Sequence, residues 1–274
     1  MREEEVMKLT AAATTPRVLA WLQHNQTAIL LHSSSHTCNL VDTQGSILSL
    51  VTTPVGRGPF ALVLPVTQFP AWPTGQPITV TLTTLAWADW LVDVEKTPLW
   101  EPRPRWDTIL PHLPTIWPWL KQVIDRQPNP LSASQWHRLE MGGQQVIQAI
   151  RARDAAAINQ AVAFLAGFGS GMTPAGDDWL MGVFYGLWVM GSDGSLLRQI
   201  AAQAGPRTTT LSAQFLSAAA DGEAVQAWHD LVLAITTGEK IVVQQAAQAI
   251  LAIGDSSGYC ALSAFLIACQ HFSR

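Results

Sequence analysis

The sequence carries little charge. Of its 274 residues, 16 are Lys or Arg and 20 are Asp or Glu, so charged side chains make up 13% of the chain, well below the roughly 25% of an ordinary soluble domain. The net charge is −4 and no cluster of basic residues occurs, which excludes the electrostatic footprint of a nucleic-acid-binding protein. Because the chain also holds 12 Trp residues, two interpretations stay open: a very large core, or a surface covered by other protein subunits or by a second copy in a homo-oligomer.

Long apolar runs and paired cysteines are also missing. The longest nearly apolar run, Trp179–Met190, has 12 residues, which is too short to span a bilayer and predicts a buried helix. Cys38, Cys260 and Cys269 provide neither metal-ligand spacing nor an even set for disulfides, so we expect buried free thiols. The seven His residues form no metal-binding motif. The start, MREEEVMKLT, lacks the pattern of a secretory signal. We therefore expect a cytoplasmic protein that makes no contact with a membrane.

Short β runs fill the first hundred residues. Stretches rich in Val, Ile, Leu and Thr are separated by turn signals at 43–45 and 56–59. With no long helical pattern between them, they predict a small antiparallel β barrel or sandwich. A connector rich in Pro and Trp follows over residues 87–118, and we interpret its aromatics as packing between domains. The predicted strands are Thr27–Leu31, Asn39–Asp42, Ile47–Thr52, Phe60–Pro65 and Ile78–Leu85.

Helical periodicity takes over from Trp119 onward. The fold class that follows is α+β, with a β-rich N-terminal domain and its connector over residues 1–105 and an all-helical domain over residues 106–274. Apolar residues recur three and four positions apart in five segments: Ala155–Ala166, Trp179–Met190, Leu211–Ala220, Ala224–Thr236 and Ile241–Ile253.

The least ordinary stretch of the chain is GFGSGMTPAGDD, residues 167–178. Glycines at alternate positions can adopt positive φ and turn successive N–H groups toward one point, which creates an anion-binding nest. Thr173 is a suitable N-cap and Pro174 a suitable first residue for the helix that follows. The positive end of that helix would then point at the loop. The predicted phosphate- or substrate-binding residues of the loop are Gly167, Gly169, Ser170, Gly171 and Thr173.

Two carboxylates lie at the start of that helix. Asp177 and Asp178 would repel a bare anion, so three roles stay open for them: a cation such as Mg²⁺ that bridges carboxylate to phosphate, orientation of an amide or hydroxyl, or a position outside the pocket. Asp178, Gly182 and Gly186 share one helix face, which leaves room for close approach of a backbone or a ligand. Asp177 and Asp178 are the candidate catalytic residues, and no other cofactor is predicted. The structural alternative is a tight turn in which both Asp residues stabilise the helix end.

The segment excludes two common nucleotide motifs. It lacks the Lys-Ser/Thr pair of a Walker loop, and an Ala-rich helix leads into it where a dinucleotide fingerprint would have a strand. The string GFGSGMTPAGDDWLMGVFYG instead resembles the signature G-x-G-x-G-[LM]-T-P-x-G-D-D-x-L-x-G of a bacterial family long labelled as of unknown function. That family includes the third subunit of oxamate carbamoyltransferase. Weaker similarities to it occur around His32, at residues 48–59, at TTTLS (208–212) and at residues 220–222.

The resemblance implies a subunit of an enzyme that moves a carbamoyl group between phosphate and an oxamate-like amide. It implies a small anionic substrate and other protein subunits as partners. A late segment, residues 254–262, is similar to the family pattern G-H-[ST]-S-G-x-D-x-L but has Asp255 in place of His and Cys260 in place of Asp. An acid–base group or cation ligand at either position would therefore be lost or altered. A second wall of the site would come from the small residues of this segment, Ser256, Ser257 and Gly258.

Three hypotheses follow for the function. The first is a carbamoyltransferase subunit that acts on oxamate- or oxalurate-like anions, with carbamoyl phosphate or phosphate bound at the glycine loop. The second is a non-catalytic, small-anion-binding or regulatory subunit that kept the pocket and lost the chemistry. The third is a structural protein with an inert glycine turn. For the segment Thr208–Ser212, the simplest interpretation is an N-cap cluster, and contact with the site is the alternative.

Overall fold

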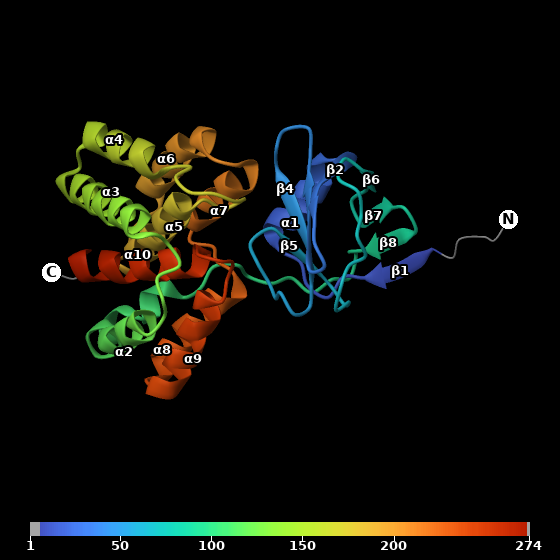
Figure 1. Cartoon of the computed structure of the whole chain (residues 1–274). Helices are drawn as coiled ribbons and strands as arrows, with labels where there is room; N and C mark the ends of the chain where they lie inside the picture. Colours follow the sequence, from blue (N-terminus) through green and yellow to red (C-terminus); the bar gives the residue numbers. More distant parts are fainter. Residues whose placement is uncertain (1–5, 273–274) are drawn as a thin grey trace. The chain divides into compact units, whose positions relative to one another are not determined.

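The chain forms two compact units, Met1–Pro102 and Arg103–Arg274, in a computed structural model that describes residues 6–272. The acidic residues 1–5 at the start of the sequence lie outside this range. Among the described residues, all eight strands and one helix lie in the first unit, and the remaining helices lie in the second (Figure 1). This confirms the predicted α+β class, with a β-rich N-terminal part and an all-helical C-terminal part.

The first unit is one eight-stranded sheet in the order β1-β8-β7-β6-β2-β3-β4-β5. Most neighbouring strands are antiparallel, as predicted, but β1 pairs with β8 and β4 pairs with β5 in parallel. The predicted run Ile78–Leu85 is a hairpin, because the Thr81 hydroxyl accepts a hydrogen bond from the Thr84 N–H and turns the chain. The elements are β1 (Met7–Thr10), α1 (Pro16–His24), β2 (Thr27–Ser33), β3 (Thr37–Val41), β4 (Ile47–Thr52), β5 (Ala61–Leu64), β6 (Pro77–Val80), β7 (Thr84–Trp87) and β8 (Trp90–Asp93).

The two ends of this sheet meet, so that it nearly closes into a barrel. The Ala12 N–H donates to the Val63 carbonyl at 2.7 Å, and the Val63 N–H donates to the Ala13 carbonyl at 3.0 Å. Since Val63 belongs to β5 and Ala12 lies two residues after the end of β1, these bonds join the first and last positions of the sheet. Closure of this kind satisfies backbone groups that an open edge would expose.

The tryptophans of β7 and β8 belong to the core of this barrel. Trp87 and Trp90 pair across the hairpin, are 4% and 5% exposed, and pack against Phe69 and Trp72. The interpretation of these residues as packing between domains was therefore wrong. The Trp–Ala–Asp–Trp sequence does not resemble an alternating strand, and the contacts that bury it come from residues that lie earlier in the chain.

The second unit contains nine helices among the described residues. Five of them, α4, α5, α7, α8 and α9, coincide with the predicted helical segments. Within residues 6–272 no helix combines the length and the apolar character that a membrane span requires. The helices are α2 (Leu113–Asp125), α3 (Ala133–Ala152), α4 (Ala155–Leu165), α5 (Ala175–Val189), α6 (Ser195–Ala204), α7 (Thr210–Ala220), α8 (Gln226–Thr237), α9 (Lys240–Leu251) and α10 (Ser257–Phe272).

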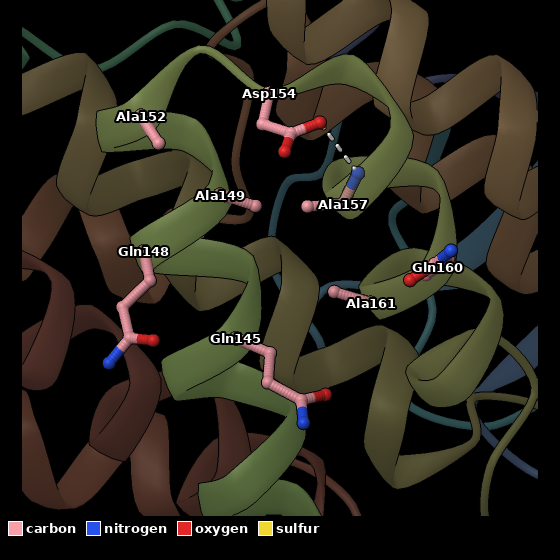
Figure 2. A pocket seen from close by; sticks show the side chains of 8 residues that line it. All are labelled: Gln145, Gln148, Ala149, Ala152, Asp154, Ala157, Gln160 and Ala161. Carbon is pink, nitrogen blue, oxygen red and sulfur yellow. Dashed lines mark hydrogen bonds between the residues drawn. The ribbon is translucent and has the colours of Figure 1, made fainter.

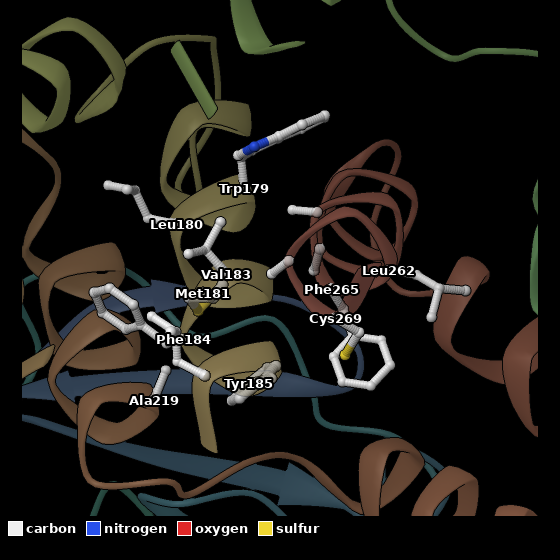
Figure 3. Packing of buried hydrophobic residues seen from close by; sticks show 14 of the residues in the cluster. Trp179, Leu180, Met181, Val183, Phe184, Tyr185, Ala219, Leu262, Phe265 and Cys269 are labelled. Carbon is white, nitrogen blue, oxygen red and sulfur yellow. The ribbon is translucent and has the colours of Figure 1, made fainter. Parts of the chain in front are cut away.

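Helix α5 is the centre of this unit, and every one of its residues is buried. It packs along α10 (Figure 3). A Cβ on Gly182 would lie 2.1 Å from the carbonyl oxygen of Ala261, and a Cβ on Gly186 would lie 2.6 Å from the Cβ of Ala268. These glycines thus permit the close backbone approach predicted for their face. Because residue numbers rise together along the contact, α5 and α10 run parallel and their N-termini lie at the same end.

The three cysteines are buried thiols outside any disulfide, as predicted. Cys38 lies in the barrel core, whereas Cys260 and Cys269 lie on α10 in the core of the helical unit. Burial raises the pKa of the Cys260 thiol to about 12, and the charge of Asp178 adds to that shift. Cys260 is therefore a neutral thiol at physiological pH.

Candidate functional site

The glycine loop, residues 166–174, joins α4 to α5. Gly167, Gly169 and Gly171 have φ angles of +72°, +120° and +90°, which confirms the predicted left-handed conformation at alternate positions. A Cβ on Gly167 would lie 2.1 Å from the carbonyl oxygen of Arg207, and one on Gly169 would lie 2.7 Å from the Ala175 nitrogen. At Gly167 and Gly169, any larger residue would be strained by the positive φ and would also clash with these atoms. Gly171 has no neighbour within 4 Å of such a Cβ, so the loop is open there.

The loop presents unpaired N–H groups. Within residues 6–272, no acceptor receives a hydrogen bond from the N–H of Gly169, Ser170, Gly171 or Met172. The Ala175 N–H, in the first turn of α5, is also without an acceptor among the described residues. The loop and the first turn of α5 therefore carry free backbone donors beside a helix N-terminus, a position that favours an oxyanion.

The start of α5 differs from the prediction by one residue. The N-cap is Pro174, which provides no side-chain cap, and the helix begins at Ala175. The predicted N-cap residue, Thr173, instead places its hydroxyl 2.9 Å from the hydroxyl of Ser257. Thr173 thereby connects the glycine loop to the first residue of α10.

Asp177 is fully engaged in hydrogen bonds. Its Oδ1 accepts from the Gly167 N–H at 2.9 Å. Its Oδ2 accepts from the Ser212 hydroxyl at 2.8 Å and from the Thr208 hydroxyl. The side chain is 0% exposed. Asp177 therefore ties the glycine loop to the start of α7, and its oxygens have little capacity left for a substrate or a cation.

The segment Thr208–Ser212 supports the loop as well as capping a helix. The Thr209 hydroxyl accepts a hydrogen bond from the Ser212 N–H at 3.1 Å, which is the N-cap contact predicted for this cluster. The same hydroxyl donates to the carbonyl of Met172 in the glycine loop. With Thr208 and Ser212 bound to Asp177, the segment holds the loop at two points. The only signal for this role before the structure was the similarity of TTTLS (208–212) to the family landmark.

Asp178 is the unusual carboxyl group of the site. It is 0% exposed, and neither of its oxygens receives a hydrogen bond from a described residue. Burial raises its pKa to about 8, and the neighbouring charge of Asp177 adds to the rise. The Ser257 hydroxyl faces the carboxyl group and lowers the pKa in part, although its contact does not meet hydrogen-bond geometry. An unpaired buried carboxyl group is costly, and its pKa suits proton exchange near neutral pH.

Of the three residues predicted to form a second wall of the site, Ser256, Ser257 and Gly258, only Ser257 faces it. Ser257 opens α10 and contacts both Thr173 and the surroundings of Asp178. Gly258 has a packing role, since a Cβ there would lie 1.8 Å from the carbonyl oxygen of Ile250. The Ser256 carbonyl accepts from the Cys260 N–H at 2.9 Å, within the first turn of α10. Asp255, at the position of the family's His, is exposed.

The structure therefore separates the roles of the two adjacent carboxylates. Asp177 and Asp178 follow one another on a helix, so their side chains leave the axis about 100° apart. Asp177 faces the start of α7, and Asp178 faces the start of α10. A cation bridging both would have to displace the donors of Asp177. Among residues 6–272, no group of three or more His, Cys, Asp or Glu side chains is arranged to hold a metal ion.

A separate groove lies between α3 and α4 (Figure 2). Alanines form its floor, and Gln145, Gln148 and Gln160 extend around it. Its carboxylate, Asp154, accepts a hydrogen bond from the Ala157 N–H at 3.0 Å and caps α4. The groove holds no unpaired charged group, and we assign it no chemistry.

The comparisons with known proteins concern the helical unit. The family described as oxamate carbamoyltransferase subunit AllH matches residues 165–269. No curated protein and no solved structure matches the chain. The matched segment starts at the end of α4 and ends within α10, so it contains the glycine loop, Asp177, Asp178, Thr208–Ser212 and Ser257. Over residues 165–269, which hold the loop and both helices that begin beside it, this chain is similar to the AllH family.

Proposed function

We propose that this chain is a subunit of a carbamoyltransferase that binds a small oxyanion at the glycine loop and uses Asp178 to exchange a proton with the reacting amide. The observation that supports this assignment is the Asp178 carboxyl group, which is buried, receives no hydrogen bond from residues 6–272, and lies between two helix N-termini. A purely structural turn has no need for such a group, because a neutral side chain of similar size would cost less to bury.

The loop supplies the features that phosphate or carboxylate recognition requires. The free N–H groups of residues 169–172 and the positive ends of α5 and α10 favour an oxyanion. Ser170, which is exposed at the centre of the loop, offers a further hydroxyl. Carbamoyl phosphate, oxamate and oxalurate each combine such an anionic group with an amide.

Asp178 fits the proton transfer of this chemistry. When an oxamate-like amide attacks the carbonyl carbon of carbamoyl phosphate, a C–N bond forms, the C–O bond to phosphate breaks and the amide nitrogen loses a proton. The ionised form of Asp178 accepts that proton. The leaving phosphate retains the electron pair of the broken bond at the donors of the loop. With a pKa of about 8, a fraction of Asp178 is ionised at neutral pH and can accept the proton. In the reverse reaction the protonated carboxyl group can donate the proton back to the amide nitrogen.

The family name carries a further consequence for partners. An oxamate carbamoyltransferase subunit acts with other protein subunits, and we propose that this chain does so too. The low charge content of the sequence is consistent with a surface that other subunits cover.

A second function is favoured by one observation. Cys260, where the family pattern has Asp, lies next to Asp178 as a neutral thiol. If the missing carboxylate performs the chemistry, this chain binds the anion and regulates or completes an assembly without catalysis.

The experiment measures binding and turnover separately. Titration calorimetry of the full chain with phosphate, carbamoyl phosphate, oxamate and oxalurate, each with and without Mg²⁺, tests the anion site. Gly169→Ala should abolish binding, because its Cβ would lie 2.7 Å from the Ala175 nitrogen. Asp107→Asn, at an exposed residue outside the site, is the control.

Turnover in the assembly with its partner subunits separates the two functions. Asp178→Asn should retain phosphate binding and lower the rate about 100-fold or more if Asp178 exchanges the proton. An unchanged rate would remove Asp178 from the mechanism and favour the binding subunit. No heat with any anion, in the wild-type chain or its assembly, would refute the site.

A further inference from the structure

Arg138 is a cation held in place beside the glycine loop. Its guanidinium carbon lies 4.5 Å from the ring centroid of Phe164 and 4.2 Å from that of Phe168. One of its N–H groups donates to the carbonyl of Phe164 at 3.0 Å. Phe164 belongs to the last turn of α4 and Phe168 to the loop itself. Two aromatic faces and one hydrogen bond thus restrict a side chain that would otherwise be among the most mobile in the protein.

The charge of Arg138 is unpaired within the described chain. No Asp or Glu of residues 6–272 lies within ion-pair distance of it. A guanidinium has five N–H donors, and the Phe164 carbonyl occupies one of them. The residue is exposed, so its remaining donors can be reached from solvent.

The position of Arg138 relative to the loop follows from its neighbours. Phe168 directly precedes Gly169, whose N–H is the first of the unpaired row. One helical turn after Arg138, Gly142 packs against the side chains of Leu165 and Phe164. This face of α3 therefore covers the junction of α4 and the glycine loop, and the guanidinium lies against Phe168, the residue that directly precedes the loop's free N–H groups.

We propose that Arg138 binds the anionic end of the ligand that occupies the glycine loop. The inference rests on the proposed function and extends the site to a third helix, α3. A guanidinium presents two parallel N–H groups to the two oxygens of a carboxylate or phosphate. The stacked rings orient it before the ligand arrives, which reduces the ordering cost of binding. Arg138 thus selects a ligand with a planar, two-oxygen anionic face and discriminates against the neutral amide of the same shape.

The test compares a charged and a neutral ligand of similar shape. Affinities of the full chain for oxamate and for oxamide are measured by titration calorimetry in wild type, Arg138→Gln and Arg138→Lys. Arg151→Gln is the matched control, because Arg151 is an exposed residue of the same helix, about 20 Å farther along it. Circular dichroism and the unfolding midpoint without ligand report on the fold.

If Arg138 binds the anion, Arg138→Gln weakens oxamate binding about 10- to 100-fold and leaves oxamide binding unchanged. Arg138→Lys keeps the charge and the ring contacts but loses the planar pair of donors, so its affinity for oxamate should be several-fold lower than that of the wild type. Added guanidinium ion should restore part of the affinity in Arg138→Gln. Equal oxamate affinity in wild type and Arg138→Gln, or equal losses for both ligands, would overturn the assignment of Arg138 while leaving the loop site intact. No oxamate binding in the wild-type chain would overturn both.

Discussion

Replacing Asp178 with Asn should make the protein more stable at neutral pH. The carboxyl group is 0% exposed and unpaired, so ionising it in the folded state is costly, and this cost appears as a pKa of about 8. An unfolded chain ionises the same group near pH 3.9. Asn has almost the same shape and cannot ionise, so the variant avoids the cost entirely.

The magnitude follows from proton linkage. Between the unfolded and folded pKa values, the folded protein holds one more proton at Asp178 than the unfolded chain. The free energy of unfolding therefore falls as the pH rises, by about 1.4 kcal/mol per pH unit. Below about pH 4 both states are protonated and the penalty vanishes, and above about pH 8 both are ionised and it is complete. From about pH 5 to about pH 7 the loss from Asp178 is ~3 kcal/mol.

Urea unfolding of wild type and Asp178→Asn at several pH values checks this expectation. The difference between the two proteins should be small near pH 4 and grow steadily to pH 8. The adjacent change Asp177→Asn is the matched control and should have the opposite sign. It puts an amide N–H₂ among three donors and removes charge-assisted hydrogen bonds, at a cost of about 1–3 kcal/mol. A parallel pH dependence in wild type and Asp178→Asn, or destabilisation by both changes, would refute our account of the two carboxylates.

Two further predictions concern the residues that surround the site. Gly182→Ala should lower the free energy of unfolding by about 3 kcal/mol or more, because its Cβ would lie 2.1 Å from the Ala261 carbonyl oxygen and backbone atoms cannot move aside cheaply. Gly171→Ala, which has free space but a φ of +90°, should lower it by only about 1 kcal/mol. Equal losses in thermal or urea unfolding would contradict the tight α5–α10 contact. The three thiols should not react with a disulfide reagent at pH 8 in the folded protein, because all three are buried and burial raises their pKa values. After unfolding, three equivalents of thiol should react. Rapid labelling of the folded protein would show that a thiol is accessible and would contradict this prediction.

Strand and helix periodicity predicted the architecture well where elements are regular. The run Ile47–Thr52, rich in Ile, Leu, Val and Thr, and the Ala-rich segment Ala155–Ala166 agree with β4 and α4 to within a residue. The elements that were not predicted have local sequences without clear strand or helix periodicity or the usual turn residues. The strand β1 is four residues long, and its parallel partner β8 follows it by some eighty residues. The turn between β6 and β7 is made by threonine hydroxyls in place of the usual Gly or Pro.

The candidate site was predictable in its loop and unpredictable in its carboxylates. Glycines at alternate positions directly indicate positive φ, and all three adopt it. The difference between Asp177 and Asp178 depends on what each meets, and those partners lie on α7 and α10, far along the chain. Arg138 had no signal in the sequence, since an Arg on a polar helix face is ordinary. Its meaning comes from the two phenylalanine rings that fold against it.

The parallel arrangement of α5 and α10 determines when the site can fold during synthesis of the chain. Neighbouring parallel helices need a long return path, and here the whole of α6–α9 provides it. The glycine loop leaves the ribosome well before Ser257 and the second helix N-terminus are made. Until then, the glycine face of α5 has no partner and the carboxyl group of Asp178 is open to water. A ribosome-bound chain that ends before Ser257 should therefore have an Asp178 with an ordinary pKa and no complete anion site, and both properties arise only once α10 has been made.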